Sequence, residues 1–414
     1  MIKKIFCFAL AILFVFPLLS CASDGDPVSI FVATDLHYIS PSLTENEEMF
    51  RKVVDNADGK VAHYSEEITE AFIDTVIKAK PDVLILSGDL TFNGAKASHE
   101  DLIKKLRRIA DAGVQVLAQP GNHDVDSSEA FSFSGEEISV TESLSSVEFR
   151  ELYSEFGLDQ AISVDEASFS YVYQTKSNAR IIMIDANSFG RGFIKDSTLE
   201  WLEAVLKQAK KDRADVITVS HQNLYAHSPL LSFGYQLYNA SALEELLTKY
   251  KVKCHLSGHI HVQSIVENKV TEIATASLAL ADIPYGKMTY ENGNLEYSVQ
   301  SVDVSAWAER SGLDDPNLLD FDAYGVKYFK DNCYRQVNET FADSSLTKEQ
   351  TELLAKTFAD INIAYFMGDK LDATEYKTGL TLWKQQGSTF FSSYLDSMVE
   401  GTKKDNKTVT VNLD

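Results

Sequence analysis

Residues 28–37 read VSIFVATDLH, an apolar and β-branched run that ends in Asp35 and His37. This pattern predicts a buried strand followed by a polar loop. It recurs in VLILSGD at 83–89 and in VQVLAQPGNHD at 114–124, where acidic, amide and imidazole side chains again follow the apolar run. We therefore predict three buried strands that each carry chemically capable side chains at the C-terminal end.

Helical patterns alternate with these strands. The apolar spacing predicts helices at 66–80, 99–113 and 198–210, and further strands at 180–185, 215–220 and 253–257. Alternating strands and helices are typical of a layered α/β domain. In such a domain the C-terminal ends of parallel strands converge on one edge, so side chains that are distant in sequence can meet there.

The character of the chain changes after a last strand-like segment at 294–304. From about residue 319 the spacing is helical almost to the end, and Thr347 with Gln350 fits a capping box. We therefore predict an α/β domain over 21–304 and a smaller all-α C-terminal domain over 305–414. Two stretches, 38–65 and 127–158, look like insertions that could overhang a site or simply be solvated loops.

Composition limits the partners of the protein. The 414 residues hold 38 Lys+Arg and 61 Asp+Glu, and 38 − 61 gives a net charge of −23, while 44% of residues are hydrophobic. So acidic a chain repels polyanions, which argues against binding of nucleic-acid polymers. A small phosphate-bearing substrate would have to meet local positive charge.

The first residues predict export. Lys3 and Lys4 precede an apolar run over 5–19 that is too short for an ordinary spanning helix, so we expect residues 1–20 to be a signal peptide. The sequence up to Cys21 resembles a bacterial lipobox, which implies lipidation of Cys21 and anchoring to a membrane of the bacterial cell envelope. Simple cleavage with an incidental cysteine is the alternative.

Cys254 and Cys333 remain in the body of the protein. One bridge between them is all the sequence permits, and we expect buried free thiols.

The residues that follow predicted strands form a candidate metal-binding set. The members are Asp35, His37, Asp89, Asn122, His221, His259 and His261. Mixed oxygen and nitrogen ligands suit Fe, Mn or Zn rather than Ca²⁺. The set is large enough for two ions if one carboxylate bridges them, and two ions roughly 3.5 to 4 Å apart can turn bound water into hydroxide and clamp a phosphoryl group.

The order of these motifs resembles the calcineurin-like metallophosphoesterase superfamily over roughly residues 28–300. The motifs are Asp35-x-His37, Gly88-Asp89, Gly121-Asn122-His123-Asp124, His221 after a strand, and Gly258-His259-Ile260-His261. Within the superfamily the chain looks most like class III cyclic nucleotide phosphodiesterases with a helical C-terminal domain. The resemblance implies a metallo-dependent phosphatase fold, a layered sandwich of mixed β-sheets flanked by helices.

The resemblance also implies roles for the candidate ligands. One ion would be bound by Asp35, His37 and His261, the other by Asn122, His221 and His259, with Asp89 as the bridge. A hydroxide held between the ions would attack phosphorus, and His123 would protonate the departing alkoxide or stabilise its charge, with Asp124 orienting it.

The remaining polar residues near these motifs are weaker candidates. Thr91, Asn93 and His227 could orient ligands or reach substrate, although a surface or structural role is the alternative for each. We expect His63, His99 and His255 to lie outside the metal site, and His255 to pack in or beside its strand.

The sequence thus predicts an exported phosphoesterase that hydrolyses small phosphodiesters, with cyclic nucleotides favoured. A phosphomonoesterase or nucleotidase, or a diesterase acting on lipid headgroups, is the alternative among enzymes. A catalytically silent binding lipoprotein is the alternative outside enzymes, and the complete ligand set argues against it.

Overall fold

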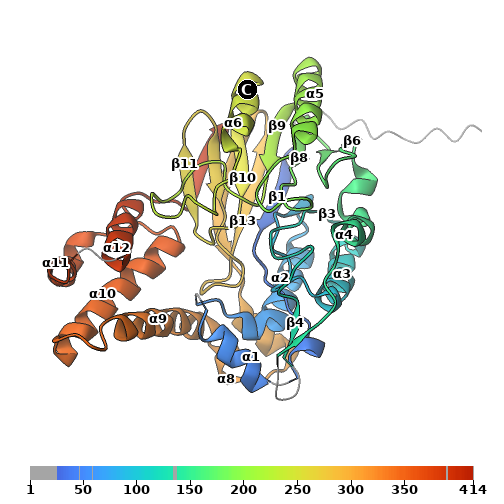
Figure 1. Cartoon of the computed structure of the whole chain (residues 1–414). Coiled ribbons are helices and arrows are strands. Elements are labelled where there is room, and N and C mark those ends of the chain that lie inside the picture. Colours follow the sequence, from blue (N-terminus) through green and yellow to red (C-terminus); the bar gives the residue numbers. More distant parts are fainter. Residues whose placement is uncertain (1–25, 46, 58, 134–137, 388–389, 414) are drawn as a thin grey trace, which may run out of the picture.

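The structure is a computed structural model, and it describes residues 26–45, 47–57, 59–133, 138–387 and 390–413. The expected signal peptide and Cys21 lie outside these residues. Within them, the chain forms two large β-sheets at the centre of the molecule with helices around them (Figure 1).

The first sheet has six strands in the order β15-β14-β13-β1-β2-β3. Their bounds are β1 Val28–Ala33, β2 Val83–Leu86, β3 Gln115–Ala118, β13 Pro284–Glu291, β14 Asn294–Ser301 and β15 Thr408–Asn412. The strands β1, β2 and β3 are parallel to one another, whereas β13 runs antiparallel to β1. The first sheet is therefore mixed.

The second sheet has seven strands in the order β11-β12-β10-β9-β8-β7-β6. Their bounds are β6 Ser163–Val164, β7 Tyr171–Gln174, β8 Ala179–Met183, β9 Asp215–Val219, β10 Cys254–Ser257, β11 Ser264–Glu267 and β12 Thr271–Ala274. The neighbouring strands β8, β9, β10 and β12 at its centre are parallel. In contrast, β7 pairs antiparallel with β8, and β11 pairs antiparallel with β12. A separate hairpin joins β4 Phe131–Ser132 to β5 Ser139–Val140.

Alternate residues of the second sheet face two different cores. Ile181 and Met183 of β8 belong to the core that also contains β1, α2 and α3, whereas Ile182 belongs to the core under α5 and α6. Successive side chains of a strand point to opposite faces, so this sheet is buried on both sides. The result is the layered α/β sandwich of mixed sheets that the sequence predicted.

The helices of this sandwich and its insertions precede residue 304. They are α1 Glu47–Val54, α2 Ser65–Ala79, α3 Lys96–Asp111, α4 Ser146–Leu152, α5 Asp196–Asp212 and α6 Ala240–Lys249. Ser145 and Glu148 form a capping box at the start of α4.

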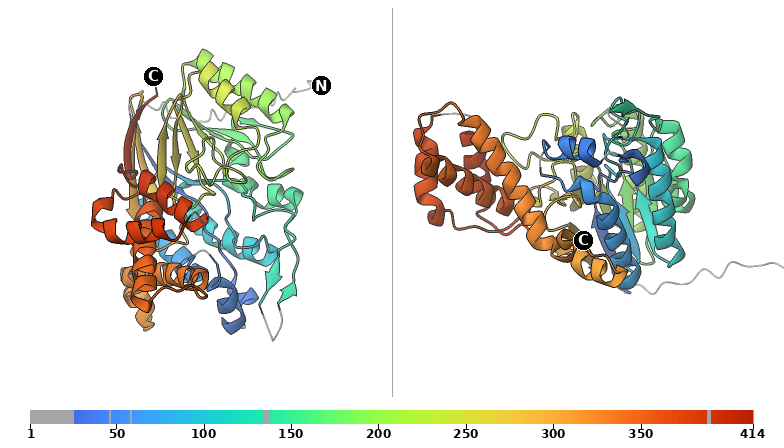
Figure 2. Two further views of the ribbon diagram at one scale, coloured as in Figure 1. Left: turned by 60° about the vertical axis from the view of Figure 1, so that its left-hand side comes forward. Right: turned by 90° about the horizontal axis from the view of Figure 1, so that it is seen from below.

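A helical region follows and lies beside the sandwich (Figure 2). It contains α7 Val304–Ser311, α8 Pro316–Leu319, α9 Phe321–Thr340, α10 Lys348–Phe366, α11 Lys377–Gln385 and α12 Phe390–Gly401. The predicted capping box is present, with Thr347 as N-cap and Gln350 reaching back to it. Phe358 and Trp383 belong to a core that α9 to α12 share with sandwich residues such as Ile260, whereas α7, α8 and the start of α9 pack on the core that contains β1.

The end of the chain differs from the all-α region expected up to residue 414. Residues 408–412 form β15, which pairs antiparallel with β14 at the edge of the first sheet (Figure 2). The sequence TVTVN alternates and is β-branched, and β14 offers an unpaired edge to it. The chain thus returns from the helical region to the sandwich.

Two further expectations concern single features. Cys254 and Cys333 are both free and buried, as predicted. Among the described residues, no helix is both long enough and apolar enough to span a bilayer.

Candidate metal centre

The predicted ligands lie in loops that follow β1, β2, β3, β9 and β10. The structure gathers them into two groups, in which the potential ligand atoms lie within 4.8 Å of one another. One group contains Asp35, His37, Asp89 and His261, and the other contains Asp89, His221 and His259. The Asn122 Oδ1 atom lies 3.2 Å from His221 Nε2, which places Asn122 beside the second group. Asp89 is shared by both.

The first group is tightly packed. His37 Nε2 lies 3.1 Å from His261 Nε2, and His261 Nε2 lies 3.2 Å from Asp35 Oδ1. The other Asp35 oxygen accepts hydrogen bonds from the Thr34 hydroxyl at 2.8 Å and from the backbone N–H of His259 at 2.9 Å. These two bonds fix the carboxylate so that Oδ1 faces the imidazoles.

The second group has its tautomers set by carbonyl oxygens. His221 Nδ1 donates to the Ser87 carbonyl at 3.0 Å, which leaves Nε2 as the ligand atom, 3.2 Å from Asp89 Oδ2. His259 Nε2 donates to the Gly234 carbonyl at 2.8 Å, which leaves Nδ1 as the ligand atom. Such outer hydrogen bonds orient metal-binding histidines and raise their basicity.

The backbone around the site is strained and crowded. Asp35, His37, Asp89, His259 and His261 all have positive φ angles, between 45° and 65°. This region costs a non-glycine residue roughly 1 kcal/mol or more, and such strain concentrates at functional sites.

Two glycines of the motifs are required by close approach. A Cβ on Gly121 would lie 2.2 Å from the Asp89 backbone nitrogen and Oδ1, and one on Gly258 would lie 1.9 Å from Thr34 Oγ1. These glycines therefore let the ligand-bearing loops touch one another.

The electrostatics of the carboxylates suit cation binding. Burial raises the pKa of Asp35 and Asp89, but the imidazoles outweigh it and hold both pKa values below the ordinary value. His261 has the largest lowering effect on the pKa of Asp35, and His221 has it on that of Asp89. Both carboxyls are therefore ionised.

The pKa values of the imidazoles shift in different directions. Burial lowers the pKa of His259 to about 4, and burial with the nearby Lys60 charge lowers that of His37. Burial also opposes charge on His221, but Asp89 raises its pKa to about 9. A cation bound at His221 would displace that proton, because a metal ligand must be deprotonated.

The residues present fit a metal cluster. Asp35 Oδ1 is buried and has no assigned hydrogen-bond partner among the described residues, and His261 Nε2 lies 3.2 Å from it. An ionised buried oxygen without a donor is costly unless a cation satisfies it. The mixed carboxylate and imidazole set matches transition metals.

His123 and Asp124 have different surroundings. His123 Nε2 lies 4.0 Å from Asp89 Oδ2, and its side chain is 34% exposed, so it adjoins the ligands and faces solvent. The Asp124 carboxylate accepts hydrogen bonds from the backbone N–H groups of Gly121, Leu90 and Thr91. Asp124 thus joins the loop that carries His123 to the segment after β2, which is the contact through which it could position His123.

The weaker candidates support structure around the site. The Thr91 hydroxyl donates to Asp124, and the Asn93 side chain donates to the Phe131 carbonyl in the second insertion. His227 Nε2 lies 3.1 Å from Glu272, with both side chains buried. None of their contacts among the described residues involves a ligand side chain.

Three histidines outside the motifs also lie outside both ligand groups. His99 donates to the Asp124 carbonyl, His255 lies in β10 between Thr218 and Ser220, and His63 contacts the Tyr324 hydroxyl.

The sequence did not indicate the role of the loop at 226–239. Its Gly234 carbonyl binds His259, and the Tyr235 ring lies 5.5 Å from the His259 ring. An aromatic and glycine-containing loop soon after His221 was the available signal, but its contact partner is some 25 residues further along the chain.

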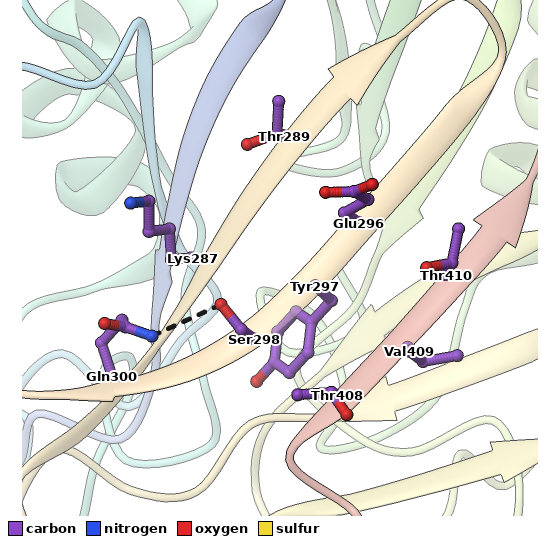
Figure 3. A pocket seen from close by; sticks show the side chains of 9 residues that line it. All are labelled: Lys287, Thr289, Glu296, Tyr297, Ser298, Gln300, Thr408, Val409 and Thr410. Atoms are coloured by element: carbon purple, nitrogen blue, oxygen red, sulfur yellow. Dashed lines mark hydrogen bonds between the residues drawn. The ribbon is translucent and has the colours of Figure 1, made fainter.

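A separate hollow of about 500 Å³ lies on β13, β14 and β15. Its side chains are mostly polar, among them Lys287, Glu296, Ser298, Gln300 and Thr408 (Figure 3). It contains none of the candidate ligands.

The fold and the metal centre define a metal-dependent phosphoric ester hydrolase. The calcineurin-like phosphoesterase family matches residues 28–263, which is more than half of the chain, so the protein belongs to this family. A second family, described as the C-terminal domain of cyclic nucleotide phosphodiesterase, matches residues 303–405.

Two relatives are similar over much of their length. A probable glycerophosphodiester phosphodiesterase from Arcobacter nitrofigilis is 25% identical over 276 residues, which cover 62% of this chain and 86% of that protein. A probable cyclic nucleotide phosphodiesterase from Ruthia magnifica is 24% identical over 257 residues, covering 60% and 94%. Among solved structures, a dimetal phosphatase from Danio rerio is 12% identical, with a TM-score of 0.49 and coverage of 67% and 97%.

Proposed function

We propose that this protein is a dinuclear-metal phosphodiesterase that hydrolyses small phosphodiesters, with cyclic nucleotides as the favoured substrates. The observation that carries the proposal is the pair of ligand groups joined through Asp89. The names of both relatives and of the C-terminal family support a diester rather than a monoester.

The proposal assigns the chain's residues to two ions. Asp35, His37 and His261 would hold one, Asn122, His221 and His259 the other, and Asp89 both. Iron, manganese or zinc ions at these positions would supply Lewis-acid activation of water and of the phosphoryl group. The Ser87 and Gly234 carbonyls keep His221 and His259 in the tautomers that such binding needs.

His123 is the proposed general acid. It adjoins Asp89, has a solvent-exposed edge, and lies outside both ligand groups. We propose that it gives a proton to the departing alkoxide, or otherwise stabilises the charge on it.

The substrate class is tested with the purified mature chain, loaded with Mn²⁺ or Fe. Cyclic mononucleotides, glycerophosphodiesters, an aryl phosphodiester and phosphomonoesters are offered side by side. We expect diesters to have the higher kcat/KM. Turnover of monoesters alone would identify a phosphatase or nucleotidase, and full metal content without turnover would identify a binding protein.

The role of His123 is tested by His123→Ala. The variant should keep both metals and lose turnover of a cyclic nucleotide by roughly 100- to 10,000-fold, as for a general acid. Its defect with a p-nitrophenyl diester should be far smaller, because p-nitrophenolate leaves without a proton. Equal defects on both substrates would assign His123 to charge stabilisation or positioning instead.

We also propose that the protein is exported and held at the bacterial cell envelope by lipid on Cys21. The charged start, the apolar run over 5–19 and the small residue before Cys21 support this. Cys21→Ser should move the protein from the membrane fraction to the soluble fraction of cells. An unchanged membrane fraction would contradict lipidation.

A further inference from the structure

Three exposed aromatic residues lie on two neighbouring loops. Phe233 is 87% exposed, Tyr238 61% and Phe193 47%. The rings of Phe233 and Tyr238 lie 6.3 Å apart, and the backbone N–H of Tyr238 donates to the carbonyl of Gly192, the neighbour of Phe193. We call these three residues the aromatic rim.

The first loop of the rim is attached to the metal centre at His259. Phe233 directly precedes Gly234, whose carbonyl accepts the 2.8 Å hydrogen bond from His259 Nε2, and Tyr235 packs against the same imidazole. Consecutive Cα atoms are 3.8 Å apart, so the backbone of Phe233 is a single residue from this contact.

The second loop is attached to the segments that carry Asn122 and His221. The Asn187 side chain donates to the Pro120 carbonyl at 3.1 Å and to Gln222 Oε1 at 3.1 Å, and Gln222 follows His221 directly. Both loops of the rim therefore border the half of the centre formed by Asn122, His221 and His259.

This position suits a flat aromatic group on the substrate. Scattered exposed apolar residues are common, but a group of them beside a catalytic centre is typical of a binding site. Aromatic faces bind nucleobases by stacking, and they do so with every base because each base has a π-face.

The charge near the rim favours a neutral base over a cationic headgroup. The Lys195 ammonium lies 3.2 Å from the centroid of the Phe189 ring, in the same loop as Phe193. A choline-type cation would be attracted to aromatic faces but repelled by this ammonium, whereas a nucleobase meets no such repulsion.

We propose that the aromatic rim is a base-stacking subsite, so that the enzyme selects phosphodiesters of nucleosides over those of glycerol. The proposal rests on the proposed phosphodiesterase function and specifies its substrate class. Phosphate would lie at the metal centre, and the base would stack on the exposed face of Phe233 beside Tyr238.

The test compares kcat/KM for a cyclic purine nucleotide with kcat/KM for glycerophosphoethanolamine, using the metal-loaded chain. Phe233→Ala should lower this ratio by about 5- to 160-fold, the usual range for loss of one stacked base. Phe233→Trp should restore it. Phe189→Ala is the control, since this phenylalanine is also exposed, at 62%, but already carries Lys195 on its face, and the variant should keep the ratio.

Binding of adenosine 5'-monophosphate, measured by calorimetry in the same variants, gives a readout apart from activity. Weaker binding in Phe233→Ala supports the subsite even if no diester is hydrolysed, an outcome that would overturn only the proposed function. An unchanged ratio with unchanged binding in an active enzyme would overturn the subsite alone. A ratio that stays constant while binding to phosphatidylglycerol vesicles falls would assign the rim to a membrane surface instead and overturn the proposal.

Discussion

Two loops that carry candidate ligands are supported in different ways. The loop at 121–124 is held by polar contacts, because the Asp124 carboxylate accepts three backbone hydrogen bonds and its carbonyl accepts one from His99. The loop at 258–263 has an apolar attachment in addition to hydrogen bonds such as that from the Gly258 N–H to the His221 carbonyl. Ile260 and Val262 belong to the same core as Phe358 in the helical region.

Hydrogen bonds reinforce the second attachment. The backbone N–H of Gln263 donates to the Phe366 carbonyl, and the Gln263 side chain donates to the Asn406 carbonyl. The first loop thus depends on nearby parts of the sandwich, whereas the second depends on helices that begin some 60 residues later. The second loop carries one member of each ligand group, His261 and His259, so both groups are connected to the helical region through it, whereas the contacts of the first loop named above lie within the sandwich.

Substitution of Asp89 should affect both ligand groups, whichever loop supports them. It belongs to both ligand groups, and its Oδ1 also accepts the backbone N–H of His123 at 2.8 Å. Asp89→Ala should therefore remove metal from both positions and reduce turnover to background. Elemental analysis of the folded variant decides this, and two retained equivalents of metal would contradict the bridging role.

Substitution of Ile260 should affect the second loop far more than the first. Ile260→Ala removes a side chain that is 3% exposed, and we expect a loss of about 2 to 5 kcal/mol in the free energy of unfolding. Since Ile260 lies between His259 and His261, the variant should also release metal more readily to a chelator.

Leu354→Ala is the control for that experiment. Leu354 is fully buried in the same core but belongs to α10, so its truncation should cost similar stability without weakening metal retention. Denaturant titration and chelator competition measure the two effects separately. Equal metal loss in both variants would show that the coupling is global and not transmitted through the loop.

Much of this architecture could be predicted because it is encoded locally. Buried strands such as VLIL at 83–86 are short apolar runs, and the ligands follow them directly, so the meeting of these side chains at one edge follows from general rules. The helices and the capping box at Thr347 are equally local signals.

What could not be predicted depends on contacts between distant segments. The pairing of β15 with β14 joins residues more than 100 positions apart. Ile260 packs against helices of the C-terminal region, and nothing in the sequence of its own loop indicates that contact. The hydrogen bond from the His259 side chain to Gly234 is accepted by a backbone carbonyl, so the residue type at position 234 does not indicate it.

The polar support of the first loop should appear as a pH dependence of stability. Burial lowers the pKa of His99 to about 4, against about 6.5 for an unfolded histidine. Between about pH 4 and pH 6.5 the imidazole of residue 99 is protonated in the unfolded chain but neutral in the folded protein. The stability that a neutral His99 contributes is therefore fully present above about pH 6.5. It is lost as pH falls towards 4, by about 3 kcal/mol at most.

His99→Gln tests this smallest effect, because an amide can still donate to the Asp124 carbonyl but does not titrate. With a chelator present, the free energy of unfolding should fall less steeply between pH 6.5 and 5 in the variant than in the parent.

His255→Gln is the matched comparison, since burial lowers the pKa of His255, which lies in β10, to about 4 as well. Both variants should flatten the dependence of the unfolding free energy on pH by similar amounts. Only His99→Gln removes a titrating support of the 121–124 loop, so only this variant should protect turnover at pH 5. If both variants protect turnover equally, acid acts on the whole fold, and the first loop has no separate polar support.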